Sequence, residues 1–257
     1  MPRWAWASVA YFLYIAAVAL FLRGLSLPAR ARACGGAAVG LLLAALGIFA
    51  DVFWAQQVVL PPVVLLVAYW CSGFLWVAPM ERAERFFLES DLRLRIPQIA
   101  ARLPRGVTEV LELAYAGVYP LVPVALALHL AYDADPDADR FWTAILVTDF
   151  ICFGMLPWVQ TRPPRTLEDH PPWRSSFRAF NVKLLGETSI GVNTVPSGHA
   201  AEALAAALLV PDAPLPVLLL MWVMALAVTG GAVFGRYHFA IDALAGWAVA
   251  AGVWTLL

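Results

Sequence analysis

The chain has 257 residues, of which 62% are hydrophobic and only 14% are charged, and its formal net charge is −1. A soluble domain is about half apolar and a quarter charged, so this composition excludes a fold that hides its apolar surface in one water-soluble core. The near-zero net charge argues against nucleic acid as a partner. We therefore predict an all-α fold, a polytopic transmembrane helical bundle.

Eight apolar runs predict about eight membrane spans. Most have about 17–22 residues, the length of helix that crosses a hydrocarbon core of roughly 30 Å. Backbone polar groups cannot stay unpaired in lipid, so each run should be a helix. In chain order the runs are Trp4–Leu22, Cys34–Ala50, Val58–Pro79, Val110–Ala131, Phe141–Val159, Ser197–Val210, Pro216–Phe234 and Phe239–Leu257.

Two stretches depart from this simple pattern. Residues 81–106 mix six arginines and four acids with large apolar side chains, which predicts an amphipathic interfacial helix on the bilayer surface or, alternatively, a solvated loop. The run Ser197–Val210 reaches only about 21 Å as a helix. Either its helix begins earlier in the chain, or its N-terminal end lies below the membrane surface.

Basic residues are divided unequally between the two sides of the predicted bundle. With eight spans, one side collects Arg23, Arg30, Arg32, the six arginines of 81–106 and the six basic residues from Arg162 to Arg236, whereas the other side has Arg3 and Arg140. The positive-inside rule then places the basic side, which carries the motifs below, in the cytoplasm. The Ala- and Arg-rich composition indicates a bacterial inner membrane.

His238 and Asp242 stand four residues apart at the start of the last run. On a helix this spacing puts both side chains on one face. A carboxylate there can accept the proton of one imidazole nitrogen, which leaves the other nitrogen free as a nucleophile. The alternative is a structural pair that joins two helices inside the membrane.

Pro196-Ser197-Gly198-His199 opens the sixth run. Ser197 is a good N-cap residue, and Gly198 lets a ligand approach the backbone. The free amides of a first helical turn bind anions, and His199 could donate a proton to a leaving oxygen. The alternative is an ordinary helix start.

Arg162-Pro163-Pro164-Arg165 follows the fifth run. Arginine offers a planar, permanently charged fork that suits phosphate oxygens, and the prolines end the helix. Taken alone, this stretch is equally explained as a basic flank of a membrane span.

Together the three motifs resemble those of the type-2 phosphatidic acid phosphatase superfamily: a basic stretch ending in Arg-Pro, then Pro-Ser-Gly-His, then an arginine with a downstream His-x-x-x-Asp. The resemblance covers residues 58–257 and implies a six-helix lipid phosphatase or phosphotransferase core, with residues 1–57 as an N-terminal two-helix extension. Met155 and Ala232 stand where the family usually has a lysine and an arginine. That departure is closest to the inositol phosphorylceramide synthase-like branch, whose members transfer a phospho-headgroup between lipids.

The resemblance also implies roles for single residues. His238 would attack phosphorus and form a phosphohistidine, Asp242 would orient it, and His199 would protonate the departing alkoxide. The phosphate-binding residues would be Arg162, Arg236, Ser197 and Gly198. The substrate would be a phospholipid, sphingolipid or isoprenoid phosphate, and no metal or other cofactor is expected because arginines neutralise the phosphate.

Three further polar residues are possible members of the site. Asp149 lies in the middle of a predicted span, Glu202 follows His199 by three residues, and Lys183, in the long loop before the second motif, could replace the missing lysine. Two other functions remain open. Asp149, Glu202 and the histidine–carboxylate pair could form the proton relay of a transporter, or the two histidines and Asp242 could hold a catalytic metal.

Overall fold

The chain forms an entirely helical structure, seen in a computed structural model that describes residues 1–49, 52 and 54–257. Its α-helices are α1 (Arg3–Phe21), α2 (Leu27–Phe49), α3 (Leu60–Gly73), α4 (Glu81–Arg93), α5 (Ile96–Ala100), α6 (Arg105–Ala116), α7 (Val118–Tyr132), α8 (Ala138–Gly154), α9 (Ser176–Thr188), α10 (Gly198–Leu208), α11 (Leu215–Phe234) and α12 (Ala240–Leu256). A π-helical turn, η1 (Ala55–Val59), leads into α3, and a 3-10 turn, η2 (Pro164–Thr166), follows α8. The predicted all-α bundle is confirmed.

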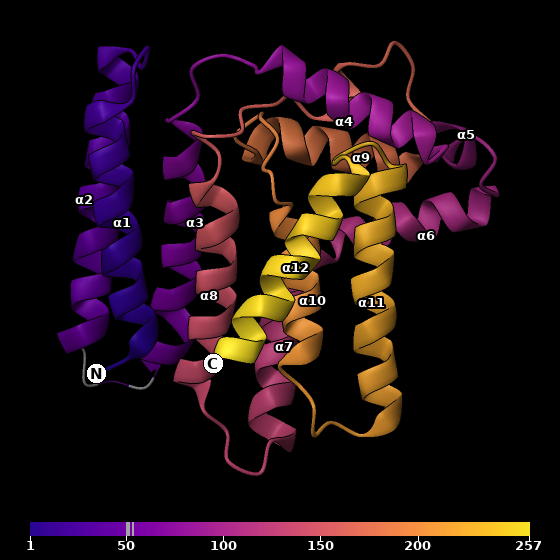
Figure 1. The fold of residues 1–257 in the computed structure, drawn as a ribbon. Coiled ribbons are helices and arrows are strands. Elements are labelled where there is room, and N and C mark those ends of the chain that lie inside the picture. Colours follow the sequence, from indigo (N-terminus) through magenta and orange to yellow (C-terminus); the bar gives the residue numbers. More distant parts are fainter. Residues whose placement is uncertain (50–51, 53) are drawn as a thin grey trace.

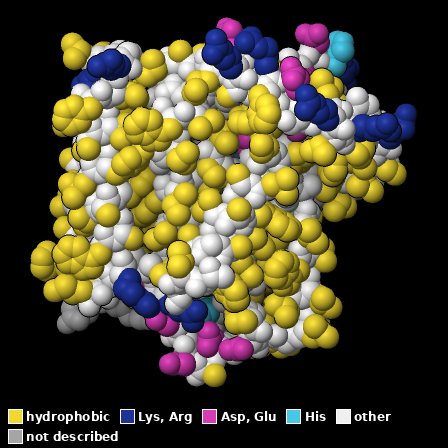
Figure 2. Space-filling model, viewed as in Figure 1, with side chains coloured by type: hydrophobic (Ala, Val, Ile, Leu, Met, Phe, Trp, Pro, Cys, Tyr) yellow, Lys and Arg dark blue, Asp and Glu magenta, His cyan; other side chains and the backbone are white. Residues whose placement is uncertain are grey.

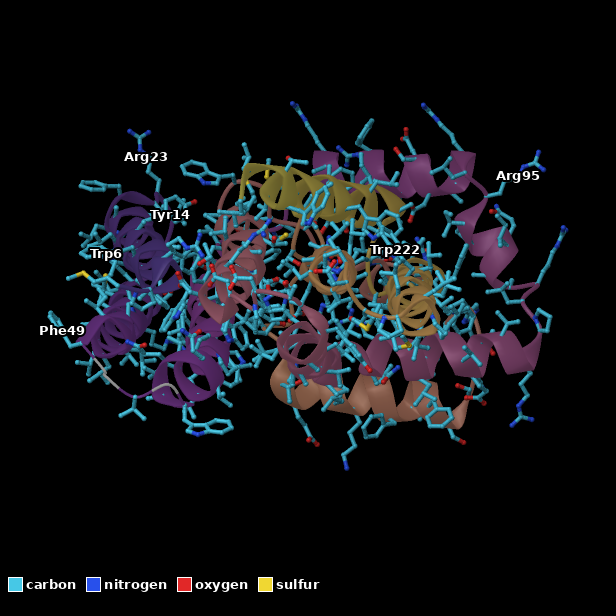
Figure 3. The ribbon with its side chains drawn as sticks, turned by 90° about the horizontal axis from the view of Figure 1, so that it is seen from below. Trp6, Tyr14, Arg23, Phe49, Arg95 and Trp222 are labelled. Carbon is cyan, nitrogen blue, oxygen red and sulfur yellow. The ribbon has the colours of Figure 1, made fainter. Side chains whose placement is uncertain are left out.

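Most of the longer helices run side by side, and α4, α6 and α9 lie across the end that is uppermost in Figure 1. Short α10 occupies the middle of the bundle, where it packs against α7, α8, α11 and α12 (Figure 3). Every residue of α10 except His199, Glu202 and Leu208 is buried, because its alanines allow the neighbouring helices to approach closely. Helices α1 and α2 pack on each other and on α3.

Among the described residues, four helical segments are long and apolar enough to cross a membrane: α1, α2, η1 with α3, and α11. The predicted span Val110–Ala131 is not one straight helix, because α6 and α7 meet at Gly117 with a bend of 64°. Counted as one broken span, this pair makes a fifth candidate. The total of eight spans stays a prediction, and the end of the run Cys34–Ala50, at Ala50, lies outside the described residues.

Two other expectations are decided by the helix boundaries. Residues 81–106 do contain an amphipathic helix, α4, whose inner face buries Glu84, Phe87 and Asp91. The sixth run does not begin earlier than its motif, because α10 starts at Gly198 directly after the N-cap Ser197. The division of the chain at residue 57 stays a prediction.

The face of the molecule drawn in Figure 2 has an apolar band between two polar ends. Large apolar side chains lie exposed on the sides of the bundle, among them Phe49 at 81% and Trp6 at 52%, and both point away from it in Figure 3. Charged side chains gather at the end that carries α4 and α6 and at the opposite end near the N-terminus. This distribution suggests a membrane protein, because exposed apolar surface on this scale requires an apolar solvent.

Helix α12 approaches the start of α10 at Gly246. A Cβ atom added there would lie 2.5 Å from the Ser197 carbonyl oxygen, so only glycine permits this contact. We expect Gly246→Ala to lower the free energy of unfolding by roughly 1–3 kcal/mol through overpacking. Gly252→Ala is the matched control, because a Cβ on the same helix at Gly252 has no described atom within 4 Å. Thermal unfolding in detergent measures both, and equal effects would contradict the close approach.

Candidate active site

A cavity of about 730 Å³ lies between α3, α7, α8 and α10. At one end it is lined by Arg165, His199 and His238, together with the segment that precedes α10. Towards the other end its wall is apolar, with contributions from η1, α3, α7 and the start of α8: Trp54, Val58, Pro62, Leu65, Leu66, Val122, Leu126, Leu130 and Trp142. The cavity therefore has a polar head and an apolar body.

The two predicted catalytic histidines meet at the polar head. Their ring centroids are 6.0 Å apart, although the residues come from different helices and are separated by 39 positions in the chain. His199, in the first turn of α10, stacks on Tyr115 at 5.1 Å and meets Tyr119 edge-on at 5.9 Å. These rings hold the His199 imidazole in place beside His238.

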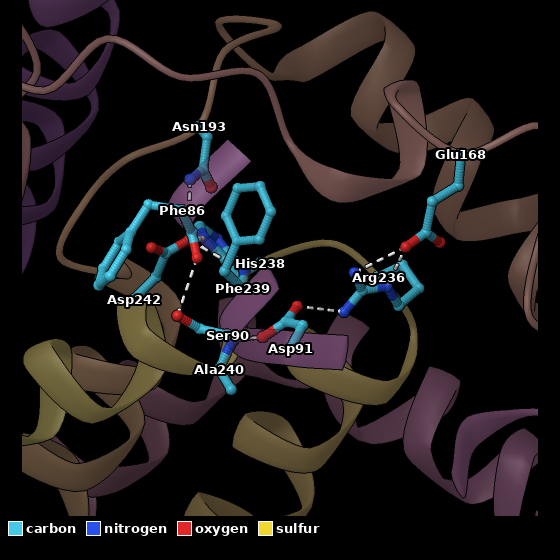
Figure 4. A network of polar contacts seen from close by, with 10 residues as sticks. All are labelled: Phe86, Ser90, Asp91, Glu168, Asn193, Arg236, His238, Phe239, Ala240 and Asp242. Atoms are coloured by element: carbon cyan, nitrogen blue, oxygen red, sulfur yellow. Dashed lines mark hydrogen bonds and ion pairs between the residues drawn. The ribbon is translucent and has the colours of Figure 1, made fainter. Parts of the chain in front are cut away.

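Asp242 lies beside His238 and anchors the loops around it (Figure 4). One carboxylate oxygen is 3.7 Å from the His238 Nδ1, somewhat longer than a hydrogen bond. The same oxygen accepts hydrogen bonds from the Phe239 backbone N–H at 3.0 Å and from the Asn193 side chain at 2.8 Å. Asp242 thus caps the N-terminus of α12, where the helix dipole favours a negative charge.

His238 is held as a neutral imidazole. Its side chain is buried, and burial together with the positive charge of Arg165 lowers the pKa of His238 from 6.5 to about 3. Its Nδ1 has no hydrogen-bond partner among the described atoms. A neutral imidazole with Nδ1 turned toward a carboxylate leaves Nε2 as the nitrogen that can attack a substrate.

Arg165 brings a positive charge to the polar head of the cavity. Its backbone N–H donates to the Arg236 carbonyl oxygen at 2.9 Å, and its guanidinium lies 5.6 Å from the centre of the Tyr237 ring. Across the described part of the chain, no carboxylate forms an ion pair with it. An arginine without an acidic partner, facing two histidines, is suited to hold a phosphate group.

The structure does not bring Arg162 to the cavity wall. Its side chain forms a two-pronged ion pair with Glu84 of α4, with nitrogen–oxygen distances of 2.7 and 3.0 Å. The Arg162 guanidinium in turn holds the pKa of the Glu84 carboxyl below its usual range. This arginine therefore fastens α4 to the segment that follows α8.

Arg236 is also outside the cavity and is completely buried (Figure 4). Its guanidinium pairs with Asp91 of α4 at 2.5 Å and with Glu168 at 2.7 Å. Asp91 also accepts the Ala240 backbone N–H at 3.0 Å, so α4 holds the N-terminus of α12. Breaking a buried ion pair is strongly destabilising, so we assign Arg236 a structural role: its ion pairs stabilise the packing of the motif that contains His238 and Asp242.

The other predicted site residues divide between the cavity and its surroundings. Gly198, Asp149 and Glu202 line the cavity. Ser197 is buried beneath it, and its hydroxyl accepts the Ala200 N–H at 3.4 Å as an N-cap. Lys183 is not in a loop as predicted, because it stands on α9, where it is exposed and away from the cavity.

Sequence reasoning missed the parts that Arg165 and Asn193 play. Arg165 belongs to the motif Arg162-Pro163-Pro164-Arg165, but nothing in a single sequence distinguishes it from Arg162. Asn193 links Asp242 to Thr161, whose hydroxyl accepts from the same Asn193 amide at 3.1 Å. Thr161 and Asn193 are far apart in sequence, and no spacing rule relates them.

Within the described residues, no group of three or more His, Cys, Asp or Glu side chains is arranged to hold a metal ion. What the polar head does offer is two imidazoles and a guanidinium. Such a set can accept an anionic group, transfer it to nitrogen and move a proton.

The depressed pKa of His238 has a consequence for stability. Between pH 6.5 and about 3 the unfolded chain binds a proton at this histidine and the folded chain does not, so stability falls as the pH falls. We expect this group to remove about 2 kcal/mol at pH 5 relative to pH 7. Thermal unfolding at both values should show a smaller decline for His238→Gln than for wild type. His170→Gln, in an exposed loop, is the control, and an identical decline in all three proteins would refute the assignment.

Comparison with known families gives one match. The model of the PAP2 superfamily matches residues 75–256, well over half of the chain, which includes α4 to α12. Comparisons with curated proteins and with solved structures give no significant match.

Proposed function

The chain belongs to the PAP2 superfamily, and from this premise we propose that it is an integral membrane enzyme that cleaves or transfers a phosphate-linked group on a lipid. Family membership supports chemistry of the phosphatase or phosphotransferase type. The lipid substrate, the histidine intermediate and the membrane location are parts of the proposal.

One observation carries this proposal: the two histidines stand at the head of a cavity whose body is apolar, together with Arg165, which has no acidic partner in the described part of the chain. A phosphate group fits the head, because Arg165 offers charge and the first turn of α10 offers backbone amides. Hydrocarbon chains fit the body, because they lose contact with water without leaving polar groups unpaired. A lipid phosphate has both parts in one molecule.

In the first step, the His238 Nε2 attacks phosphorus and the bond from phosphorus to the leaving oxygen breaks. His199 enters this step as the imidazolium, its positive charge balanced by the bound phosphate, and donates its proton to that oxygen, so that an alcohol departs and a phosphohistidine remains. Arg165 balances the charge on the phosphoryl oxygens as the transition state forms. Asp242 stabilises the positive charge that develops on the His238 ring.

In the second step, His199 takes the proton from water or from an acceptor hydroxyl, whose oxygen attacks phosphorus. The bond from phosphorus to nitrogen breaks, and neutral His238 is restored. With water as the acceptor, the enzyme is a phosphatase. With a lipid hydroxyl as the acceptor, it is a transferase of the kind found in the inositol phosphorylceramide synthase-like branch. Both outcomes use the same residues, so they are separated by the acceptor that enters.

An enzyme explains the cavity better than a transporter does. A proton relay needs polar side chains along the whole depth of the membrane. Here the polar lining residues Asp149 and Glu202 lie near the histidines, whereas the wall from Leu65 and Leu126 to Trp142 is apolar. The catalytic end also carries the basic segments around α4 and α6, which supports the cytoplasmic placement proposed from the charge count.

Turnover with trapping of a phosphoenzyme tests the function. We expect purified protein in detergent to release phosphate from a radiolabelled lipid phosphate, or to pass the group to an added lipid alcohol, in the presence of EDTA. A quenched reaction should contain protein label that acid removes and base does not, as a phosphohistidine requires. His238→Ala should lose both label and turnover with its unfolding temperature preserved. Turnover by His238→Ala would refute the mechanism, and dependence on a metal would favour a metallohydrolase.

Arg165 provides a second, independent test. We expect Arg165→Ala to lower kcat/KM by roughly 10²–10³, because a charge that faces the transferred group is lost in a water-poor site. Arg165→Lys should lie between this variant and wild type, because it keeps the charge without the planar fork. Arg174→Ala is the control, since Arg174 is exposed in the same loop. Equal activity of the Arg165 and Arg174 variants would exclude Arg165 from phosphate binding.

A further inference from the structure

Two carboxyl groups in the cavity have no part in the mechanism above. Asp149 of α8 is 1% exposed, and neither of its side-chain oxygens has a hydrogen-bond partner among the described atoms. Glu202 of α10 lines the same cavity. A buried polar group without a partner costs free energy, so its retention in an otherwise apolar wall points to a ligand that supplies the missing hydrogen bond.

The pair lies between the phosphate site and the apolar body of the cavity. Along α10, Glu202 is about 4.5 Å beyond His199, away from the polar head. Asp149 is beside Gly198, where a Cβ atom would lie 3.5 Å from its carboxylate oxygen. On α8, Trp142 lines the apolar body about 10 Å further along the helix. A lipid with its phosphate at the histidines therefore places the atoms next to the phosphate at this pair.

We infer that Asp149 and Glu202 bind a hydrogen-bond donor, a hydroxyl or an amine N–H, that the lipid carries within a few bonds of its phosphate. This inference rests on the proposed lipid-phosphate function and narrows its substrate class. A hydroxyl can donate to one carboxyl group and accept from a protonated one, and an amine N–H can donate to either, so such a lipid supplies the hydrogen bonds that the pair lacks. A lipid with only hydrocarbon or esterified oxygens at that place leaves them unpaired.

The test uses three lipid phosphates that share one acyl chain and one phosphate. The first has a free hydroxyl at the carbon next to the phosphate-bearing carbon, the second has an amino group there, and the third has only hydrogen. We expect the hydroxyl or the amino compound to exceed the deoxy compound by roughly 10- to 100-fold in kcat/KM with the wild-type protein.

Two results of this assay would overturn the inference in different ways. Equal turnover of all three compounds, or preference for the deoxy compound, refutes the carboxyl site and leaves the lipid-phosphate function standing. Turnover of none of them, with or without a lipid alcohol as acceptor, refutes the proposed function and the inference with it.

Variants separate ligand binding from a purely structural role. Asp149→Leu and Glu202→Leu should bring the ratio of hydroxyl to deoxy turnover close to one. Their unfolding temperatures should be no lower than that of wild type, because an unpaired buried carboxyl is replaced by an apolar side chain.

Asp149→Asn keeps an acceptor oxygen and should therefore keep part of the preference for the hydroxyl compound. Glu187→Leu, an acid replaced on the exposed face of α9, should keep the whole ratio. A lower unfolding temperature with an unchanged ratio would show that the pair only holds helices together.

Discussion

The site depends on the hydrogen bonds that Asp242 accepts at the start of α12. Its carboxylate accepts from the Phe239 N–H and from Asn193, and its carbonyl oxygen accepts the Ser197 N–H at 2.9 Å. These bonds tie the segment before α10 to the turn that carries His238. A buried carboxyl group needs hydrogen-bond donors, so the donors that Asp242 requires fix the relative position of two motifs.

The three motif arginines, Arg162, Arg165 and Arg236, have different roles because their ion-pair partners differ. Arg162 and Arg236 are neutralised by carboxylates, two of which come from α4, and so they attach that helix to the site. Arg165 has no such partner within the described residues and faces the cavity. Charge that is already paired cannot also balance a phosphate, so the distribution of acids decides which arginine is available for substrate.

The polarity of the cavity wall changes from one end to the other. The head combines neutral His238 with a guanidinium, the middle holds two carboxyl groups, and the body is hydrocarbon. Under the proposed function, each layer suits a different part of a lipid phosphate, so the cavity would align one molecule with its phosphorus at His238. The rigid packing of α10 among its four neighbours keeps these layers in register.

The sequence by itself determined the helical class, the family and the pairing of His238 with Asp242, because apolar length and a spacing of four residues act locally. It did not reveal the break at Gly117, helix α9, the ion pairs of Arg162 and Arg236, or the cavity that Asp149 and Glu202 share. Those features depend on which helices become neighbours. Only the tertiary structure decides that, since burial and charge pairing join residues that no sequence period relates.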